Sequence, residues 1–242
     1  MLPSGRFVQE VALGDEGLIC GFAKGSVLLD TSSCEPWLTV ETAGRLAEAG
    51  VAMVDAPVSG AQIGAQQGEL VFMVGAEHPA LVRVRPLLEV MGRQMFHLGG
   101  IGAGHTMKCL NNMITAMTFM ATAEGLAIGT RLGLDPNAMT DVLNVSTGMS
   151  WISQTHIKQR ITSRTFDDAF KLELMVKDIG IAMRLAGEAP VPAPLCGTGQ
   201  QLWRAAVQHA EKGASISEMV RWVEDMTGVT IAAAGTERCL NE

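Results

Sequence analysis

The stretch "LGGIGAGHTMKCLNNMITAMTFMATAEGLAIGTRLG", residues 98–133, separates two kinds of sequence in this chain. Its glycine-rich start, 98–104, has the composition of a hinge between domains. Residues 105–133 lack proline and repeat apolar residues at spacings of three and four. That periodicity predicts a long helix, closed by Gly133 and followed by Pro136.

The sequence on either side of this stretch follows different patterns. Upstream, strand-like runs at 26–30, 51–57 and 69–76 alternate with helix-like runs at 37–50 and 78–92. Such alternation predicts an α/β layer with parallel strands. Downstream only helices are predicted, at 136–146, 168–187, 195–212 and 215–227. We therefore expect an α/β domain over 1–101, followed by an all-helical domain over 102–242 that is built on the long helix.

Composition excludes several classes of protein. The chain has 242 residues, of which 48% are hydrophobic and 18% charged, and its net charge is -7. Without a basic run, nucleic acid and anionic membranes are not expected partners. No apolar run has transmembrane length, and the N-terminus lacks a signal-peptide pattern. An odd number of cysteines without a CxxC pair predicts free thiols, no metal site and a cytoplasmic location. The cysteines are Cys20, Cys34, Cys109, Cys196 and Cys239.

Three polar residues begin the long helix. Lys108 and Asn112 are four positions apart and share one helix face, and Asn111 lies beside them. One interpretation is an exposed helix end with solvated side chains. The other is a ligand site, favoured by the neighbouring hinge because clefts between domains commonly bind ligands. In that site the lysine could attract a carboxylate or a developing alkoxide, or transfer a proton.

A second polar group occurs in "FKLELMVKD", residues 170–178. Helical spacing predicts one face formed by Phe170, Leu174, Lys177 and Asp178. The opposite, packing face is predicted to contain Leu172, Met175, Ile179 and Met183. A lysine–aspartate pair on a helix is most often a solvated surface feature, and that interpretation stays open on spacing alone.

Taken in order, several motifs resemble the β-hydroxyacid dehydrogenase family. They are "MLPSGRFVQEVALG", "DTSSCEP", "DAPVSGAQIGAQQGELVFMVGA", "GIGAGHTMKCLNNM", "AEGLAIGTRLGLDP" and "FKLELMVKDIGIAMRLA". The family includes 3-hydroxyisobutyrate dehydrogenase, tartronate semialdehyde (2-hydroxy-3-oxopropionate) reductase and the glyoxylate/succinic semialdehyde reductases. The resemblance covers nearly the whole chain and weakens after about residue 215. It implies a Rossmann-type sheet domain followed by a helical dehydrogenase domain.

The resemblance also implies residue roles. Ser59 and Gly60 would hold a substrate carboxylate, and Lys108 would polarise the carbonyl and transfer the proton. The other substrate-binding positions are Asn111, Asn112, Phe170 and Asp178. The positions lining a nicotinamide cofactor, NAD or NADP, are Leu2, Pro3, Ser33 and Lys177.

The implied activity is NAD(P)-dependent interconversion of a small 3-hydroxy acid and its semialdehyde. A homodimer or homotetramer through the helical domain is also implied. One alternative is a non-catalytic remnant that serves as a dimerisation or binding module. A decarboxylating 6-phosphogluconate-type enzyme is less favoured, because the helical part is much shorter and no basic cluster for a sugar phosphate is visible.

The sequence departs from the family in its phosphate-binding loop. Dinucleotide binding uses G-x-G-x-x-G after a strand. The pair Gly102 and Gly104 is followed by Met107, the pair Gly197 and Gly199 is followed by Leu202, and neither follows a predicted strand. We therefore expect an N-terminally truncated chain without its pyrophosphate loop, whose turnover would return with the upstream segment.

Two smaller features bear on the substrate. Many relatives have glycine where this chain has Ala61, so the added methyl group could narrow the range of substrates. The chain contains no tyrosine, which excludes a tyrosine acid. Imine-reducing relatives generally lack the lysine, so Lys108 favours carbonyl and alcohol chemistry.

Overall fold

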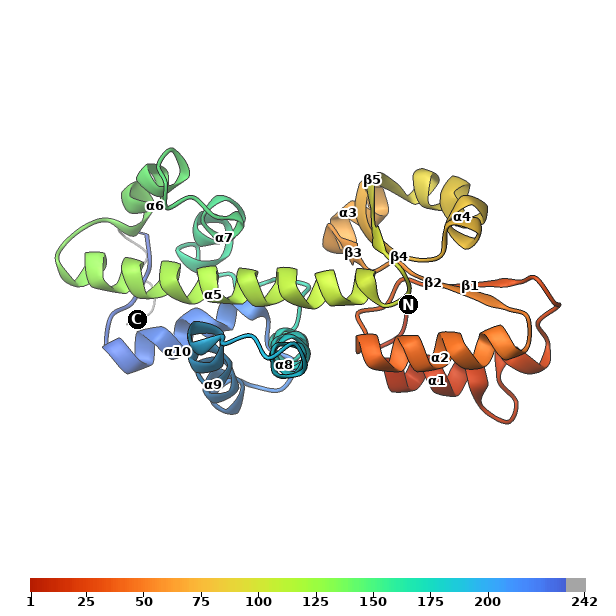
Figure 1. Ribbon diagram of the computed structural model, residues 1–242. Coiled ribbons are helices and arrows are strands. Elements are labelled where there is room, and N and C mark those ends of the chain that lie inside the picture. Colours follow the sequence, from red (N-terminus) through yellow and green to blue (C-terminus); the bar gives the residue numbers. More distant parts are fainter. Residues whose placement is uncertain (234–242) are drawn as a thin grey trace. The chain divides into compact units, whose positions relative to one another are not determined.

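The computed structural model describes residues 1–233, which form two compact units (Figure 1). The first unit is Met1–Asn111, and the second begins at Asn112. Helix α5, Ala103–Arg131, begins in the first unit and continues into the second. The prediction of an α/β part followed by a helical part is confirmed.

The first unit is built on a five-stranded sheet. Its strands are β1 (Val27–Asp30), β2 (Ala52–Asp55), β3 (Val58–Ser59), β4 (Leu70–Gly75) and β5 (Gly92–Gly99). Strands β1 and β2 are parallel, with Asp30 opposite Asp55, and β4 and β5 are also parallel. Strand β4 runs antiparallel to β2 and β3, so the prediction of an all-parallel sheet is wrong there. The reason is that the chain doubles back after β3 through α3 (Ala61–Gln67), without the crossover that parallel neighbours require.

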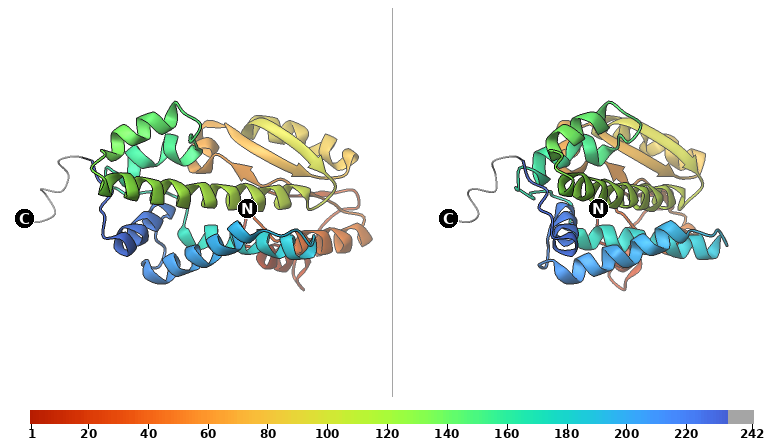
Figure 2. Two further views of the ribbon diagram at one scale, coloured as in Figure 1. Left: turned by 60° about the vertical axis from the view of Figure 1, so that its left-hand side comes forward. Right: turned by 90° about the vertical axis from the view of Figure 1, so that its left-hand side faces the viewer.

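Helices cover the two faces of this sheet (Figures 1 and 2). Helices α1 (Gly5–Leu13) and α2 (Pro36–Glu48) pack on one face, and α4 (His78–Met91) packs on the other. Successive strand residues alternate between the faces, as the pleat requires. Leu28 and Met53 belong to the core under α1 and α2. Leu29 and Val54 belong to the core under α4.

Several short elements escaped sequence-based prediction. They are α1, α3, β5, the 3₁₀ turn Leu18–Cys20, α7 (Trp151–Thr155) and the π-helical turn Ile157–Ile161. Strand β5 is half-buried or exposed along its length, so it lacks the apolar alternation that marks a strand. Helix α3 lies in a glycine-rich segment that has the composition of a turn.

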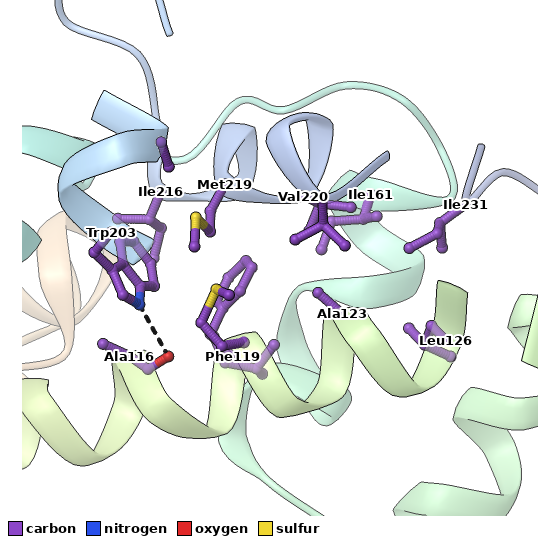
Figure 3. Close-up of a cluster of buried hydrophobic side chains, with 14 of the residues drawn as sticks. Ala116, Phe119, Ala123, Leu126, Ile161, Trp203, Ile216, Met219, Val220 and Ile231 are labelled. Atoms are coloured by element: carbon purple, nitrogen blue, oxygen red, sulfur yellow. Dashed lines mark hydrogen bonds between the residues drawn. The ribbon is translucent and has the colours of Figure 1, made fainter. Parts of the chain in front are cut away.

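The second unit is helical throughout its described residues, apart from an isolated bridge between Lys171 and Ser215. Besides α5 and α7 its helices are α6 (Pro136–Asn144), α8 (Leu172–Glu188), α9 (Pro194–His209) and α10 (Met219–Thr227), preceded by the 3₁₀ turn Ile216–Glu218. These confirm the four predicted downstream helices. Figure 3 shows the core, in which Phe119 of α5 packs edge-on against Trp203 of α9. The Trp203 indole N–H donates a hydrogen bond to the Ala116 carbonyl at 3.2 Å.

Two further expectations concern the described part of the chain. None of its helices is long and apolar enough to cross a membrane. The four cysteines within residues 1–233 form no disulfide, and Cys239 lies outside the described residues.

Candidate active site

The first turn of α5 is fixed to the carboxyl end of β2 by Asp55. One carboxylate oxygen of Asp55 accepts the Gly102 N–H at 2.7 Å, and the other accepts the His105 N–H at 2.8 Å. Because helix N-termini carry unpaired amides, this carboxylate acts as a cap supplied from a distant strand. Burial raises the pKa of Asp55 above its usual value, although the nearby His105 and these amides oppose the rise.

This arrangement decides the role of the first glycine pair. The expectation that Gly102 does not follow a strand is wrong, since β5 ends at Gly99 and α5 begins at Ala103. Its amide, however, is already bound by Asp55. A side chain at Gly104 would collide with the Met73 carbonyl and the Asp55 backbone. These glycines therefore allow close packing and capping, and they do not form a phosphate cradle.

The second glycine pair is also structural. Gly197 and Gly199 lie inside α9, away from any strand-to-helix turn. A side chain at Gly199 would collide with the thioether of Met117. The chain therefore contains no G-x-G-x-x-G loop at either position.

The predicted cofactor-lining residues of the first unit lie beside the carboxyl end of β1. The Leu2 N–H donates to the Ser32 hydroxyl at 2.8 Å, which joins the segment before α1 to the segment after β1. Pro3 follows as an exposed residue, and Ser33 is half-buried between buried Ser32 and Cys34. In open α/β sheets ligands bind at the carboxyl ends of strands. These residues therefore lie where such sheets commonly bind ligands.

The predicted carboxylate-holding residues lie where β3 turns into α3. Ser59 ends β3 and is half-buried, and Gly60 is exposed with φ +121°. That φ is open to glycine and strained for other residues. Ala61 also has a positive φ, +52°, which is uncommon for alanine. A turn with two successive positive φ values therefore follows Ser59, and Ala61 adds a methyl group to that turn.

The three polar residues at the start of the long helix are not simply solvated. Lys108 is only 9% exposed and Asn112 only 5%, so the interpretation of an exposed helix end is wrong for both. Asn111 is half-buried. Lys108 and Asn111 fall in the first unit, and Asn112 begins the second.

Within the second unit, Asn112 is joined to Asp178. The Asn112 amide donates to one carboxylate oxygen of Asp178 at 2.6 Å. The Lys177 ammonium lies 3.2 Å from the other oxygen, an ion pair whose angles fall short of a hydrogen bond. Asp178 is only 1% exposed, so the interpretation of a solvated surface pair is wrong for this residue. Two predicted positions 66 apart in sequence are thus in direct contact.

Phe170 differs from its expected placement. Helix α8 begins at Leu172, so Phe170 precedes the helix and does not share its face with Lys177 and Asp178. Its ring packs, partly buried, against the core of the second unit. The predicted packing face is confirmed at Leu172, Met175 and Ile179, which are all buried.

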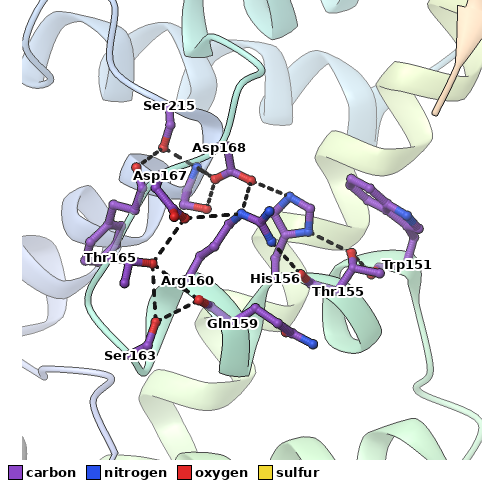
Figure 4. Close-up of polar contacts among 12 residues, drawn as sticks. Trp151, Thr155, His156, Gln159, Arg160, Ser163, Thr165, Asp167, Asp168 and Ser215 are labelled. Atoms are coloured by element: carbon purple, nitrogen blue, oxygen red, sulfur yellow. Dashed lines mark hydrogen bonds and ion pairs between the residues drawn. The ribbon is translucent and has the colours of Figure 1, made fainter. Parts of the chain in front are cut away.

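A polar network that sequence reasoning missed holds the segment before Phe170 (Figure 4). Asp168 accepts a hydrogen bond from His156 at 2.7 Å, pairs with Arg160 at 3.0 Å and accepts the Ser217 hydroxyl. Burial alone would raise the pKa of Asp168. The bonds from His156 and Ser217, with the charges of His156 and Arg160, outweigh burial and hold that pKa below its usual value.

A second missed cluster lies in the first unit. Asp30, Cys34 and His105 each present a potential metal ligand, and these atoms lie within 4.8 Å of one another. The His105 Nε2 atom, however, lies 3.0 Å from the Ser32 carbonyl, which can only accept. Nε2 must therefore carry a proton and is not free to bind a metal ion, so we assign this cluster to hydrogen bonding.

Fold and site together define a nicotinamide-dependent oxidoreductase with a Rossmann-like first unit and a helical second unit. Two family models match the chain. Residues 1–99 match the NAD binding domain of 6-phosphogluconate dehydrogenase, and residues 102–223 match the model described as NAD-binding of NADP-dependent 3-hydroxyisobutyrate dehydrogenase.

Individual relatives agree with these models. The chain is 37% identical to 3-hydroxyisobutyrate dehydrogenase of Pseudomonas aeruginosa, over 86% of this chain and 72% of the relative. It is 32% identical to 2-(hydroxymethyl)glutarate dehydrogenase of Eubacterium barkeri, over 96% of this chain and 77% of the relative. Among solved structures, 3-hydroxyisobutyrate dehydrogenase of Mycobacterium tuberculosis, determined with L-serine, matches with TM-score 0.82 and 28% identity. That match covers 92% of this chain and 77% of the other. The chain belongs to the β-hydroxyacid dehydrogenase family.

Proposed function

We propose that the protein interconverts a small 3-hydroxy acid and its semialdehyde, of the 3-hydroxyisobutyrate or tartronate semialdehyde type, with NAD or NADP. The observation that carries this proposal is the bond between Asn112 and Asp178, two positions for which the family resemblance implies substrate binding. Relatives named for 3-hydroxyisobutyrate, L-serine and 2-(hydroxymethyl)glutarate support a substrate that carries both a hydroxyl and a carboxylate.

Lys108 is proposed as the acid/base group. During reduction, negative charge grows on the carbonyl oxygen as its carbon gains hydride. An ammonium within hydrogen-bond reach stabilises that charge and supplies the proton that completes the alcohol. In the oxidative direction the same amine accepts the hydroxyl proton. The burial of Lys108 supports this role, because electrostatic interactions are stronger where water is excluded.

The remaining residues bind and orient. The Ser59 hydroxyl and Gly60 N–H are proposed to hold the substrate carboxylate, and Ala61 limits the size of the neighbouring group. Asn112 is proposed to orient the substrate hydroxyl, since its bond to Asp178 fixes the direction of its amide. Asn111 is proposed to make a further substrate contact, and Phe170 and Asp178 are proposed to close over the substrate.

Leu2, Pro3, Ser33 and Lys177 are proposed to line the nicotinamide group. The bound cofactor supplies or accepts hydride, and the protein supplies placement and electrostatics. Titration with both cofactors measures whether the protein prefers NAD or NADP.

We also propose that the protein is a homodimer or homotetramer through its second unit. Large apolar side chains remain exposed there, including Ile128, Leu134 and Val142. Exposed apolar surface of this kind commonly marks an interface. Light scattering coupled to gel filtration measures the mass, and a monomer at working concentrations would contradict this part of the proposal.

The activity test combines cofactor titration with turnover. NADH and NADPH are titrated by fluorescence, and consumption is then followed with methylmalonate semialdehyde and tartronate semialdehyde. Lys108→Met should lower kcat by about a thousandfold, as loss of an acid/base group does, while cofactor binding is retained. Lys158→Met is the matched control, because Lys158 is a partly exposed lysine that pairs with Asp141.

Two outcomes would contradict the proposal. The first is a folded protein that neither binds cofactor nor turns over any semialdehyde even when a G-x-G-x-x-G segment is supplied upstream, which would support the alternative of a non-catalytic binding module. The second is equal kcat values for Lys108→Met and Lys158→Met, which would remove the lysine from the reaction.

A further inference from the structure

We infer that His105 is a positioning residue: it holds the segments that line the cofactor and the lysine-bearing turn of α5 in one fixed arrangement. The inference rests on the proposed function for its consequence in catalysis, but the linkage itself concerns only the first unit. His105 is fully buried, and the family resemblance implies no role for it.

Three separate segments meet at His105. Its Nε2–H donates to the Ser32 carbonyl at 3.0 Å, after β1. Its Nδ1 lies 2.7 Å from the Thr39 hydroxyl, on α2. Its backbone N–H is bound by Asp55, at the end of β2. One residue therefore joins the first turn of α5 to the ends of two strands and to a helix.

Ser32 extends this linkage to the start of the chain. While its carbonyl accepts from His105, its hydroxyl accepts the Leu2 N–H at 2.8 Å. The Ser32 N–H donates to an Asp30 carboxylate oxygen at 2.9 Å, which fixes the serine from a third side. A shift of the His105 ring would therefore move Ser32, and with it Leu2.

The next turn of α5 also contacts the segment that follows β1. The Cys109 thiol, four positions after His105 and on the same helix face, lies 4.0 Å from the Cys34 carbonyl. The two residues that flank Ser33 are thus both held by α5. Lys108 lies between these two contacting positions of the helix, so a shift of its backbone would disturb the contacts with the loop that carries Ser33.

Two buried carboxylates flank the imidazole ring. An Asp30 oxygen lies 3.8 Å from Nε2, and an Asp55 oxygen lies 3.8 Å from Nδ1. The Asp30 oxygen therefore lies near the Nε2–H, and the Asp55 oxygen lies near the nitrogen that contacts Thr39. An apolar side chain of similar volume could fill the same space, but it could satisfy neither the Ser32 carbonyl nor the two carboxylates. The role is therefore chemical as well as steric.

The test compares His105→Leu with His105→Gln in the full chain. Leucine removes the ring hydrogen bonds, whereas the glutamine amide can still donate to Ser32. His105→Leu should weaken NADH binding by about tenfold, the equivalent of one lost buried hydrogen bond, and should lower kcat. His105→Gln should recover most of both. All measurements are made well below the melting temperature of each variant.

Hydrogen–deuterium exchange supplies a readout that is independent of activity. In His105→Leu, exchange should accelerate together in residues 2–5, 31–34 and 102–110. His156→Gln is the matched control, because His156 is also buried and hydrogen-bonded but lies in the second unit. It should leave exchange in these three segments and the dissociation constant of NADH unchanged.

Acceleration confined to 102–110 would overturn the linkage. Unchanged NADH binding and kcat in His105→Leu, beside accelerated exchange in all three segments, would overturn the positioning role. If the unaltered protein fails to bind NADH or NADPH even when a G-x-G-x-x-G segment is supplied upstream, the proposed function fails, and the exchange pattern still decides whether His105 links the segments.

Discussion

Each unit of the protein contains one buried histidine beside a buried aspartate, yet the two clusters have opposite characters. In the first unit the Asp55 carboxylate accepts two backbone amides at the start of α5, with His105 at 3.8 Å. In the second unit the Asp168 carboxylate bonds directly to the His156 ring at 2.7 Å and lies beside Arg160.

This difference shows that burial alone does not set the charge preference of an acid. Desolvation raises the pKa of Asp55, and the nearby histidine and neutral amides only partly oppose it. Desolvation also acts on Asp168, but bonds from His156 and Ser217 and the charges of His156 and Arg160 lower its pKa below the usual value. The carboxylate of Asp55, which binds backbone amides, therefore has a raised pKa. The carboxylate of Asp168, which binds charged side chains, has a lowered one.

The largest effect should come from breaking the second cluster. Asp168→Ala leaves buried His156 and half-buried Arg160 without their carboxylate and should lower the free energy of unfolding by about 3–5 kcal/mol. Urea unfolding measures this change. Asp167→Ala is the control, since Asp167 is exposed and pairs with Arg160 at 3.5 Å, and it should cost at most about 1 kcal/mol. Equal losses in the two variants would contradict the assignment.

The first cluster should give a smaller loss. Asp55→Ala leaves the Gly102 and His105 amides without their acceptor and should cost about 2–3 kcal/mol of unfolding free energy. Asp55→Asn keeps one acceptor oxygen and should cost less. The same denaturant titration measures both variants. An asparagine variant as unstable as the alanine variant would show that charge, and not capping, dominates at this site.

The pH dependence should separate the clusters by sign. Asp55, with a folded pKa above its usual 3.8, contributes stability that is present below pH 3.8 and lost as pH rises through the raised value. Asp168, with a lowered pKa, contributes stability that is present above pH 3.8 and lost as pH falls through the lowered value. Unfolding free energies of Asp55→Asn and Asp168→Asn, relative to the unaltered chain across pH, measure this. Slopes of the same sign would refute the comparison.

The smallest effect concerns one hydroxyl on α2. Thr39 and Thr42 are both buried, and the hydroxyl of each lies within hydrogen-bond distance of a backbone carbonyl four residues earlier. Only Thr39 also contacts His105. Thr39→Val should therefore destabilise the protein by about 1 kcal/mol more than Thr42→Val, as measured by thermal unfolding. Equal melting temperatures would show that the Thr39 contact adds nothing to the cluster.

The sequence predicted much of the fold because its main elements carry their own signals. Helix α5 was located from apolar spacing and Gly133, and β1, β2 and β4 from short apolar runs. The antiparallel course of β4 was missed because strand direction depends on how β3 and α3 return the chain. Strand β5 was missed because few of its side chains are buried.

Site residues were found by family position more than by local pattern. Lys108, Asn112 and Asp178 stand in motifs that carry the resemblance. Spacing alone leaves a solvated helix end and a ligand site equally open for Lys108 and Asn112, and it favours a solvated surface pair for Asp178. The histidine clusters escaped notice because their partners are distant in sequence: 73 positions separate His105 from Ser32. The spacing of residues along one helix or strand cannot predict a contact between segments so far apart in sequence.

The buried side chain of Trp203 is an intrinsic fluorescence probe. That indole is fully buried and bonded to the Ala116 carbonyl, so its emission reports directly on the core of the second unit. The first unit contains a single tryptophan, Trp37 on α2. In a Trp37→Phe variant all indole emission comes from the second unit. Fluorescence and a global probe such as circular dichroism would then reveal whether the two units melt together or one after the other.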